Sequence, residues 1–135
     1  DIDSPYRMLF NASTSPVELV GNMGTILALP NNNYELLITD FGNKMPEQTL
    51  VDMKLKYSLD SYAFQNVYNK RVHGIRVRNI KNARDFLTFR SQDDFKRLEQ
   101  AVANVSCCIK NKLFYPRESV MCSICNAKEY CKVWC

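Results

Sequence analysis

The cysteines have the spacing most characteristic of a chemical site in this chain. All six lie after residue 106, and the last four follow the pattern Cys122-x2-Cys125-x5-Cys131-x3-Cys135. A gap of two residues lets both thiolates of a turn face one ion, and four thiolates complete a tetrahedral zinc site. The same ligand set can hold an iron–sulfur cluster. We therefore predict zinc in the tail, with a 4Fe-4S cluster as the alternative.

Two disulfides in a secreted protein are a third interpretation of these cysteines. Asn11-Ala12-Ser13 and Asn104-Val105-Ser106 would then serve as glycosylation acceptors. However, disulfide scaffolds usually spread their cysteines along the chain, and Asn104 lies inside a predicted helix. The metal interpretation is therefore favoured. Cys107 and Cys108 are expected to be ordinary helix residues.

Basic side chains are concentrated in the second part of the chain. Residues 1–53 contain two basic and seven acidic side chains, a net charge of −5, whereas residues 54–135 carry a net charge of +9. Such a block predicts contact with a polyanion such as nucleic acid, and the alternative is a solvated face that meets an acidic protein. The candidate nucleic-acid contacts are Lys70, Arg71, Arg76, Arg78, Lys81 and Arg84.

Length and composition predict an ordinary globular domain. The chain has 135 residues, of which 46% are hydrophobic and 24% charged. It contains no long apolar run that would span a membrane, and no basic-then-apolar leader opens it. Because it begins with Asp1, we expect a trimmed, processed or fragmentary chain.

The apolar pattern predicts the elements that position these groups. Residues 1–16 are polar and contain two prolines, which indicates an irregular lead-in. Strands at 17–20, 25–29 and 34–40, with a turn at 30–33, predict a hairpin over 17–40.

Helices and further strands alternate after this hairpin. Helical spacing predicts a helix over 57–72 that ends at Gly74, followed by strands at 75–80 and 86–89. Ser91-Gln92-Asp93-Asp94 is a capping box in front of an apolar run that steps by three and four from Phe95 to Ile109. The predicted fold class is α/β (α+β), with a mixed sheet and flanking helices. Its divisions are a lead-in (1–16), a core domain (17–115) and a Cys-rich metal tail (116–135).

The order of these features resembles the RecB-like branch of the PD-(D/E)XK nucleases. That family includes CRISPR-adaptation nucleases and helicase–nuclease subunits with a terminal iron–sulfur cluster. The resemblance covers about 17–135 and is most specific from Phe114-Tyr115-Pro116 through Cys131. It implies a restriction-endonuclease-like core, and a larger polypeptide or complex that supplies the family's N-terminal helical part.

The resemblance also implies where catalytic residues should be. In the family, acids on two strands hold Mg²⁺, and a lysine helps to activate the attacking water. The motif Gly-x-x-Asp falls on Gly21-Asn22-Met23-Gly24, and Asp-aromatic-Lys falls on Asp40-Phe41-Gly42. The helical Gln-x3-Tyr falls on Asp60-x3-Phe64. In this register one acid and the lysine are glycines, so catalysis should be lost and the Asp40 carboxylate should have a structural partner such as a turn amide.

A second register of the family motif on this sequence retains the catalytic residues. Asp40 then supplies the first Mg²⁺ ligand, and Asp52-Met53-Lys54 supplies the Asp-x-Lys motif, with Gln65 and Tyr68 on the helix. The step from Lys54 to Gln65 is short for the family, so the degenerate register is favoured. Alternatively, Asp52 and Lys54 belong to a solvent-exposed face ahead of the helix and have no catalytic role.

The sequence thus predicts a non-catalytic nuclease-like domain that binds DNA or scaffolds a larger nucleic-acid-processing assembly. The first alternative is an active Mg²⁺-dependent DNA exonuclease, and the second is a secreted, disulfide-bonded interaction domain. We expect an intracellular location, in cytoplasm or nucleus, without a membrane partner. The thirteen asparagines are consistent with an AT-rich or viral genome.

Overall fold

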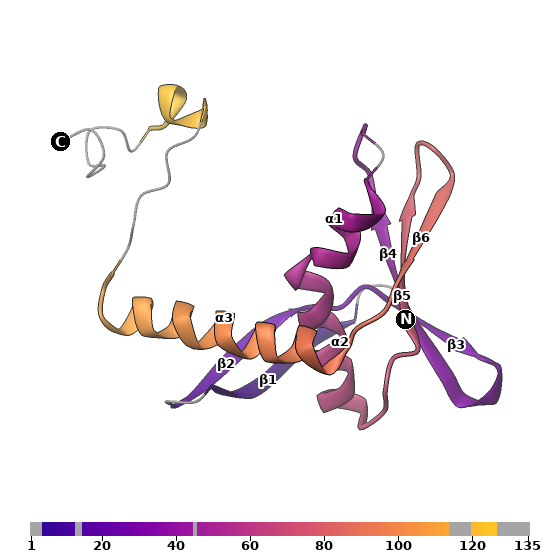
Figure 1. Cartoon of the computed structure of the whole chain (residues 1–135), viewed down its shortest axis with the longest axis horizontal. Coiled ribbons are helices and arrows are strands. Elements are labelled where there is room, and N and C mark those ends of the chain that lie inside the picture. Colours follow the sequence, from indigo (N-terminus) through magenta and orange to yellow (C-terminus); the bar gives the residue numbers. More distant parts are fainter. Residues whose placement is uncertain (1–3, 13–14, 45, 114–119, 127–135) are drawn as a thin grey trace. The chain divides into compact units, whose positions relative to one another are not determined.

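The computed structural model describes residues 4–12, 15–44, 46–113 and 120–126 (Figure 1). The chain divides into two compact units, Asp1–Ala103 and Asn104–Cys135, which are described separately. The fold is of the mixed α+β class, with a mixed sheet and flanking helices.

A four-stranded sheet forms the centre of the first unit. Its order is β3 (Thr25–Leu29), β4 (Asn33–Asp40), β5 (Gly74–Asn79) and β6 (Arg84–Thr88). The β4–β5 pair is parallel, and the two outer pairs are antiparallel. The predicted hairpin is confirmed for β3 and β4, which join through the short helix η1 (Pro30–Asn32).

Two helices cross over between the parallel strands. They are α1 (Gln48–Met53), which the sequence pattern did not predict, and α2 (Leu55–Tyr68). The helix predicted over 57–72 is present but ends earlier, because Asn69 takes a left-handed conformation with φ 51° and ends α2. Asparagine tolerates that conformation better than most residues do.

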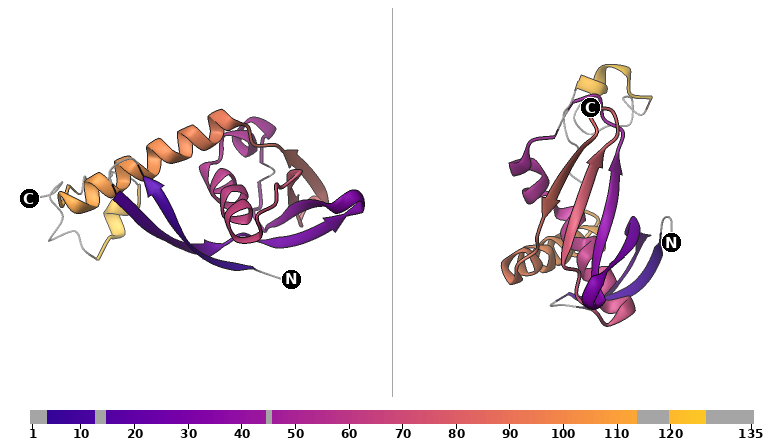
Figure 2. Two further views of the ribbon diagram at one scale, coloured as in Figure 1. Left: turned by 90° about the horizontal axis from the view of Figure 1, so that it is seen from below. Right: turned by 90° about the vertical axis from the view of Figure 1, so that its right-hand side faces the viewer.

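The expectation of an irregular lead-in is wrong over β1 (Pro5–Ala12). This strand pairs antiparallel with β2 (Ser15–Asn22), and Figure 2 shows the two strands side by side. Tyr6, Met8 and Phe10 alternate along β1 and are all buried. The rings of Phe10 and Tyr62 on α2 lie 4.9 Å apart, so the hairpin packs on the helix. β2 therefore belongs to this hairpin and not to the one formed by β3 and β4.

The core lies between one face of the sheet and the helices. It contains Leu36, Ile75 and Val77 from the sheet and Phe64 from α2, all of them buried. Successive residues of a strand point to opposite faces, so Arg76, which lies between Ile75 and Val77, points to the other face of the sheet.

The third α-helix, α3 (Gln92–Lys110), begins at the predicted capping box. The Ser91 N–H donates to Asp94 Oδ2 at 2.9 Å, and the Asp94 N–H donates to Ser91 Oγ at 3.3 Å. The second unit takes the end of α3 and a short helix, η2 (Val120–Ile124). No helix in the described part of the chain is both long and apolar enough to cross a membrane.

Candidate functional site

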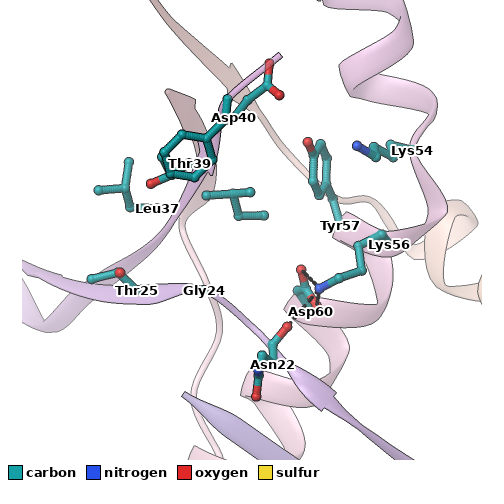
Figure 3. A pocket seen from close by; sticks show the side chains of 12 residues that line it. Asn22, Gly24, Thr25, Leu37, Thr39, Asp40, Lys54, Lys56, Tyr57 and Asp60 are labelled. Carbon is teal, nitrogen blue, oxygen red and sulfur yellow. Dashed lines mark hydrogen bonds and ion pairs between the residues drawn. The ribbon is translucent and has the colours of Figure 1, made fainter. Parts of the chain in front are cut away.

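A cleft of about 480 Å³ opens where β4 ends, beside the first turn of α2 (Figure 3). Sites commonly form outside the carboxyl ends of parallel strands, because the crossover connection leaves a crevice there. The lining combines polar and charged side chains from three parts of the chain, among them Asn22, Thr25, Thr39, Asp40, Lys54, Lys56, Tyr57 and Asp60.

Asp40 is held at the end of β4 by two hydrogen bonds. The side-chain amide of Asn79 donates to Oδ2 at 2.9 Å, and the Gly42 N–H donates to Oδ1 at 3.1 Å. These donors, in that order, lower the pKa of Asp40, and the charge of Lys54 adds a smaller effect. Asp40 is therefore an anion near neutral pH, and the expected turn-amide partner of its carboxylate is confirmed.

The second carboxylate of the cleft is paired within the protein. Asp60 is fully buried, and Lys56 Nζ lies 2.5 and 2.7 Å from its two oxygens. Lys56 also donates to the carbonyl oxygen of Asn22 at 2.8 Å. Burial raises the pKa of Asp60, while Lys56 opposes that shift. The pKa of Tyr6 is raised by burial and then by the Asp60 charge.

Gly24 faces the cleft in a conformation that strains a residue with a side chain. Its φ is +73°, and a Cβ atom there would lie 2.8 Å from the backbone oxygen of Leu37. Gly42 has no positive φ, and its Cβ atom would meet the Asp40 carboxylate at 3.2 Å. A side chain at position 24 would therefore have to displace backbone, whereas the closest contact of one at position 42 would be with the Asp40 side chain.

The structure brings together only part of the second register. Asp40 and Lys54 line the same cleft, and Lys54 Nζ lies 5.1 Å from the ring centroid of Tyr57. Asp52 is absent from that lining. It is exposed on α1 and accepts a hydrogen bond from Gln48 at 2.9 Å. Within the described ranges, no group of three or more His, Cys, Asp or Glu residues could hold a metal ion.

Sequence reasoning missed Lys56, Tyr57 and Asn79 as parts of this site. The spacing of four between Lys56 and Asp60 is a helical ion-pair signal that was available. No local signal marks Asn79, because its contact with Asp40 spans 39 positions of sequence.

Two of the predicted nucleic-acid contacts form ion pairs on the open face of the sheet. Arg76 Nη2 lies 2.8 Å from Glu35 Oε2, and Arg78 binds both carboxylate oxygens of Asp85, at 2.8 and 2.7 Å. The hydrogen bonds that both arginines donate to these carboxylates raise the pKa of each guanidinium group. Part of the positive charge of the segment is thus neutralised inside the fold.

The other predicted contacts lie near opposite ends of β5. Lys70 and Arg71 come before β5, and Lys70 Nζ donates to the Tyr34 hydroxyl at 2.7 Å. Lys81 and Arg84 follow β5, and Lys81 bonds the side chain of Asn43. Six residues of strand separate these groups by about 20 Å.

The described residues include only part of the cysteine motif. Cys122 is half-buried and Cys125 is exposed, and the Cys125 N–H donates to the Cys122 carbonyl at 3.4 Å. Cys131 and Cys135 lie outside the described residues, so the four-thiolate centre stays a prediction. Cys107 and Cys108 are helix residues of α3, as expected.

Comparison of the chain with family models, curated proteins and solved structures gives no match. The site must therefore be judged from its own geometry. It offers one carboxylate held by neutral donors, one lysine beside a phenol ring, and a second carboxylate that a lysine already neutralises.

Proposed function

We propose that this chain is a non-catalytic, nuclease-like domain that binds DNA within a larger nucleic-acid-processing assembly. One observation carries the proposal: Gly24, Asp40 and Asp60 all line one cleft at the end of β4. These are the positions that the degenerate register assigns to the chemical site, and they come from three separate segments of the chain.

The contents of the cleft support the loss of catalysis. Hydrolytic Mg²⁺ is usually held by carboxylates together with substrate phosphates, and a nearby group must activate the water. Gly24 offers no side-chain ligand, Gly42 offers no ammonium group, and Asp60 is paired with Lys56. Asp40 alone is a weak ligand set.

Basic side chains around the same end of the sheet support DNA binding. The segment after β4 meets the segment after β5, where the Ile80 N–H donates to the Asp40 carbonyl at 3.1 Å. In the described part of the chain, Lys54, Lys81 and Arg84 have no carboxylate partner. Three phosphate contacts would give a log–log salt slope of about −3 on duplex DNA.

Fluorescence anisotropy with labelled DNA tests this proposal. The double variant Lys81→Gln, Arg84→Gln should bind every sequence more weakly and with a shallower salt slope, because phosphate contacts carry no base information. Arg7→Gln, Lys96→Gln removes the same charge from β1 and α3 and is the matched control. No binding at low salt, or equal losses in both double variants, would contradict the proposal.

An active nuclease remains the second candidate because Asp40 and Lys54 share the cleft. Incubation of linear DNA with Mg²⁺ or Mn²⁺ separates the two functions. We expect no cleavage, and no change on Asp40→Ala. Cleavage that Asp40→Ala abolishes would establish the enzyme.

We also propose that Cys122, Cys125, Cys131 and Cys135 hold zinc. The backbone hydrogen bond across Cys122-x2-Cys125 is consistent with a metal-binding turn. Metal analysis of the intact chain should give one zinc per chain. Visible absorbance from iron would indicate a cluster, and a shift on a non-reducing gel would indicate disulfides.

A further inference from the structure

The outer edge of β3 is an unprotected strand edge. β3 is the terminal strand of the sheet, and no strand of the described chain pairs with its outer side. Its sequence, TILAL, contains no charge and no proline. Folded proteins usually block such an edge with a charge, a proline, a bulge or a covering element, because its free backbone groups pair readily with another strand.

The opposite edge of the same sheet carries such protection. β6 begins with the charged residues Arg84 and Asp85. Gln48 of α1 also reaches the edge and donates its side-chain amide to the Leu87 carbonyl at 3.1 Å. Within the described residues, β3 is therefore the edge of this sheet that lacks such protection.

A groove of about 330 Å³ lies beside this edge. It runs between the core-side face of β3 and the end of α2, where the rings of Phe64 and Tyr68 lie 4.9 Å apart. Tyr34 completes the aromatic wall, with its ring centroid 5.5 Å from that of Phe64. The lining residues are Ile26, Ala28, Tyr34, Phe64, Tyr68 and Lys70.

One end of the groove is positively charged. The left-handed Asn69 ends α2, and Lys70 Nζ then lies 4.6 Å from the ring centroid of Tyr34. No carboxylate of the described chain pairs with Lys70 or with the adjacent Arg71. A partner with its own carboxylate would therefore complement this end.

We propose that the β3 edge binds an extended, acidic segment of a partner protein by β-strand addition. The backbone of the segment would extend the sheet, and alternate side chains would enter the groove on the face of Ile26 and Ala28. Its acidic group would lie at Lys70. A second copy of this chain fits less well, because its β3 strand, TILAL, carries no acidic residue to place at Lys70.

This site is separate from the DNA-binding cleft. Lys54 precedes α2 and Lys70 follows it, and the 14 residues of the helix span about 20 Å. A failure to bind DNA would therefore not contradict peptide binding at the β3 edge. A failure to bind peptides would likewise not contradict DNA binding.

Selection of random linear peptides displayed on phage, against the intact chain, tests the inference. We expect the selected peptides to alternate apolar and polar residues and to contain Asp or Glu. In hydrogen exchange they should protect amides of residues 25–29. Recovery of no peptide above background, or protection of β6 in place of β3, would overturn the inference.

Two variants with matched controls locate the contact. Ala28 is exposed, so Ala28→Glu should fold and should weaken peptide binding about tenfold or more, because a carboxylate in the groove would repel an acidic segment. Ala28→Val should change binding by less than about fivefold, the range that strand preference spans. Lys70→Gln should weaken binding about two- to fivefold, and Lys96→Gln should not change it.

The remaining outcomes also decide between occupants. Equal peptide affinity for Ala28→Glu and Ala28→Val would overturn the inference. Concentration-dependent dimers by light scattering, with protection of 25–29 in the absence of peptide, would identify a second copy as the occupant. Protection of these residues by single-stranded DNA would identify nucleic acid.

Discussion

Replacement of Gly24 by alanine should destabilise the fold far more than the same change at Gly42. The two glycines flank the same carboxylate-bearing strand end, yet only Gly24 has a positive φ, of 73°. Its added Cβ atom would lie 2.8 Å from the Leu37 backbone oxygen, closer than real Cβ contacts come.

The expected loss follows from two costs. A left-handed conformation costs a residue with a Cβ atom about 1–2 kcal/mol. Displacement of the Leu37 carbonyl, where β3 pairs with β4, costs on the order of one hydrogen bond, about 1 kcal/mol. Gly24→Ala should therefore lower the free energy of unfolding by about 2–3 kcal/mol.

Urea unfolding of the intact chain measures this loss as a shift in midpoint at constant m-value. Gly42→Ala is the control and should cost less, about 1 kcal/mol or below, because its Cβ atom would crowd the hydrogen-bonded Asp40 carboxylate but would not force backbone to move. Equal effects at the two positions would refute the argument. The same strain implies that Gly24→Asp loses stability and does not restore a Mg²⁺ ligand.

Three further changes test the electrostatics and the capping. Arg76→Met should lower the free energy of unfolding by about 1–2 kcal/mol, because it leaves the nearly buried Glu35 carboxylate unpaired, and Arg78→Met should lower it less. The raised pKa of Asp60 makes the folded protein bind more protons than the unfolded chain. Stability should therefore fall as pH rises from about 4 through the folded pKa, and Asp60→Asn should flatten that part of a urea midpoint–pH curve. Ser91→Ala should cost about 0.5–2 kcal/mol by removing the cap of α3, which thermal unfolding would detect as a lower midpoint.

Local signals were sufficient for several elements. The capping box predicted the start of α3, since a serine and an acid three residues later satisfy free N–H groups wherever a helix begins. Turn residues between two apolar runs predicted the hairpin of β3 and β4. The mixed sheet with flanking helices followed from the order of these elements.

Other elements were missed where local and tertiary signals disagree. The alternation of Tyr6, Met8 and Phe10 is a strand pattern, but Pro5 and Pro16 favoured an irregular segment. Proline is tolerated in both strands of this two-stranded hairpin because it lies at or near their ends. α1 is only six residues long, which is too short for its periodicity to stand out.

The sequence alone placed Asp40 at a strand end and, through a resemblance, assigned Gly24 and Asp60 to the same site. Only the tertiary structure decided what each charge contacts. Arg76 meets Glu35 across 41 positions, and Asp40 meets Asn79 across 39, so no local pattern could assign these pairs. The composition gives the number of charged side chains, whereas the strand register determines which of them form ion pairs. For that reason the basic segment was visible in the sequence, and its division into paired and unpaired groups was not.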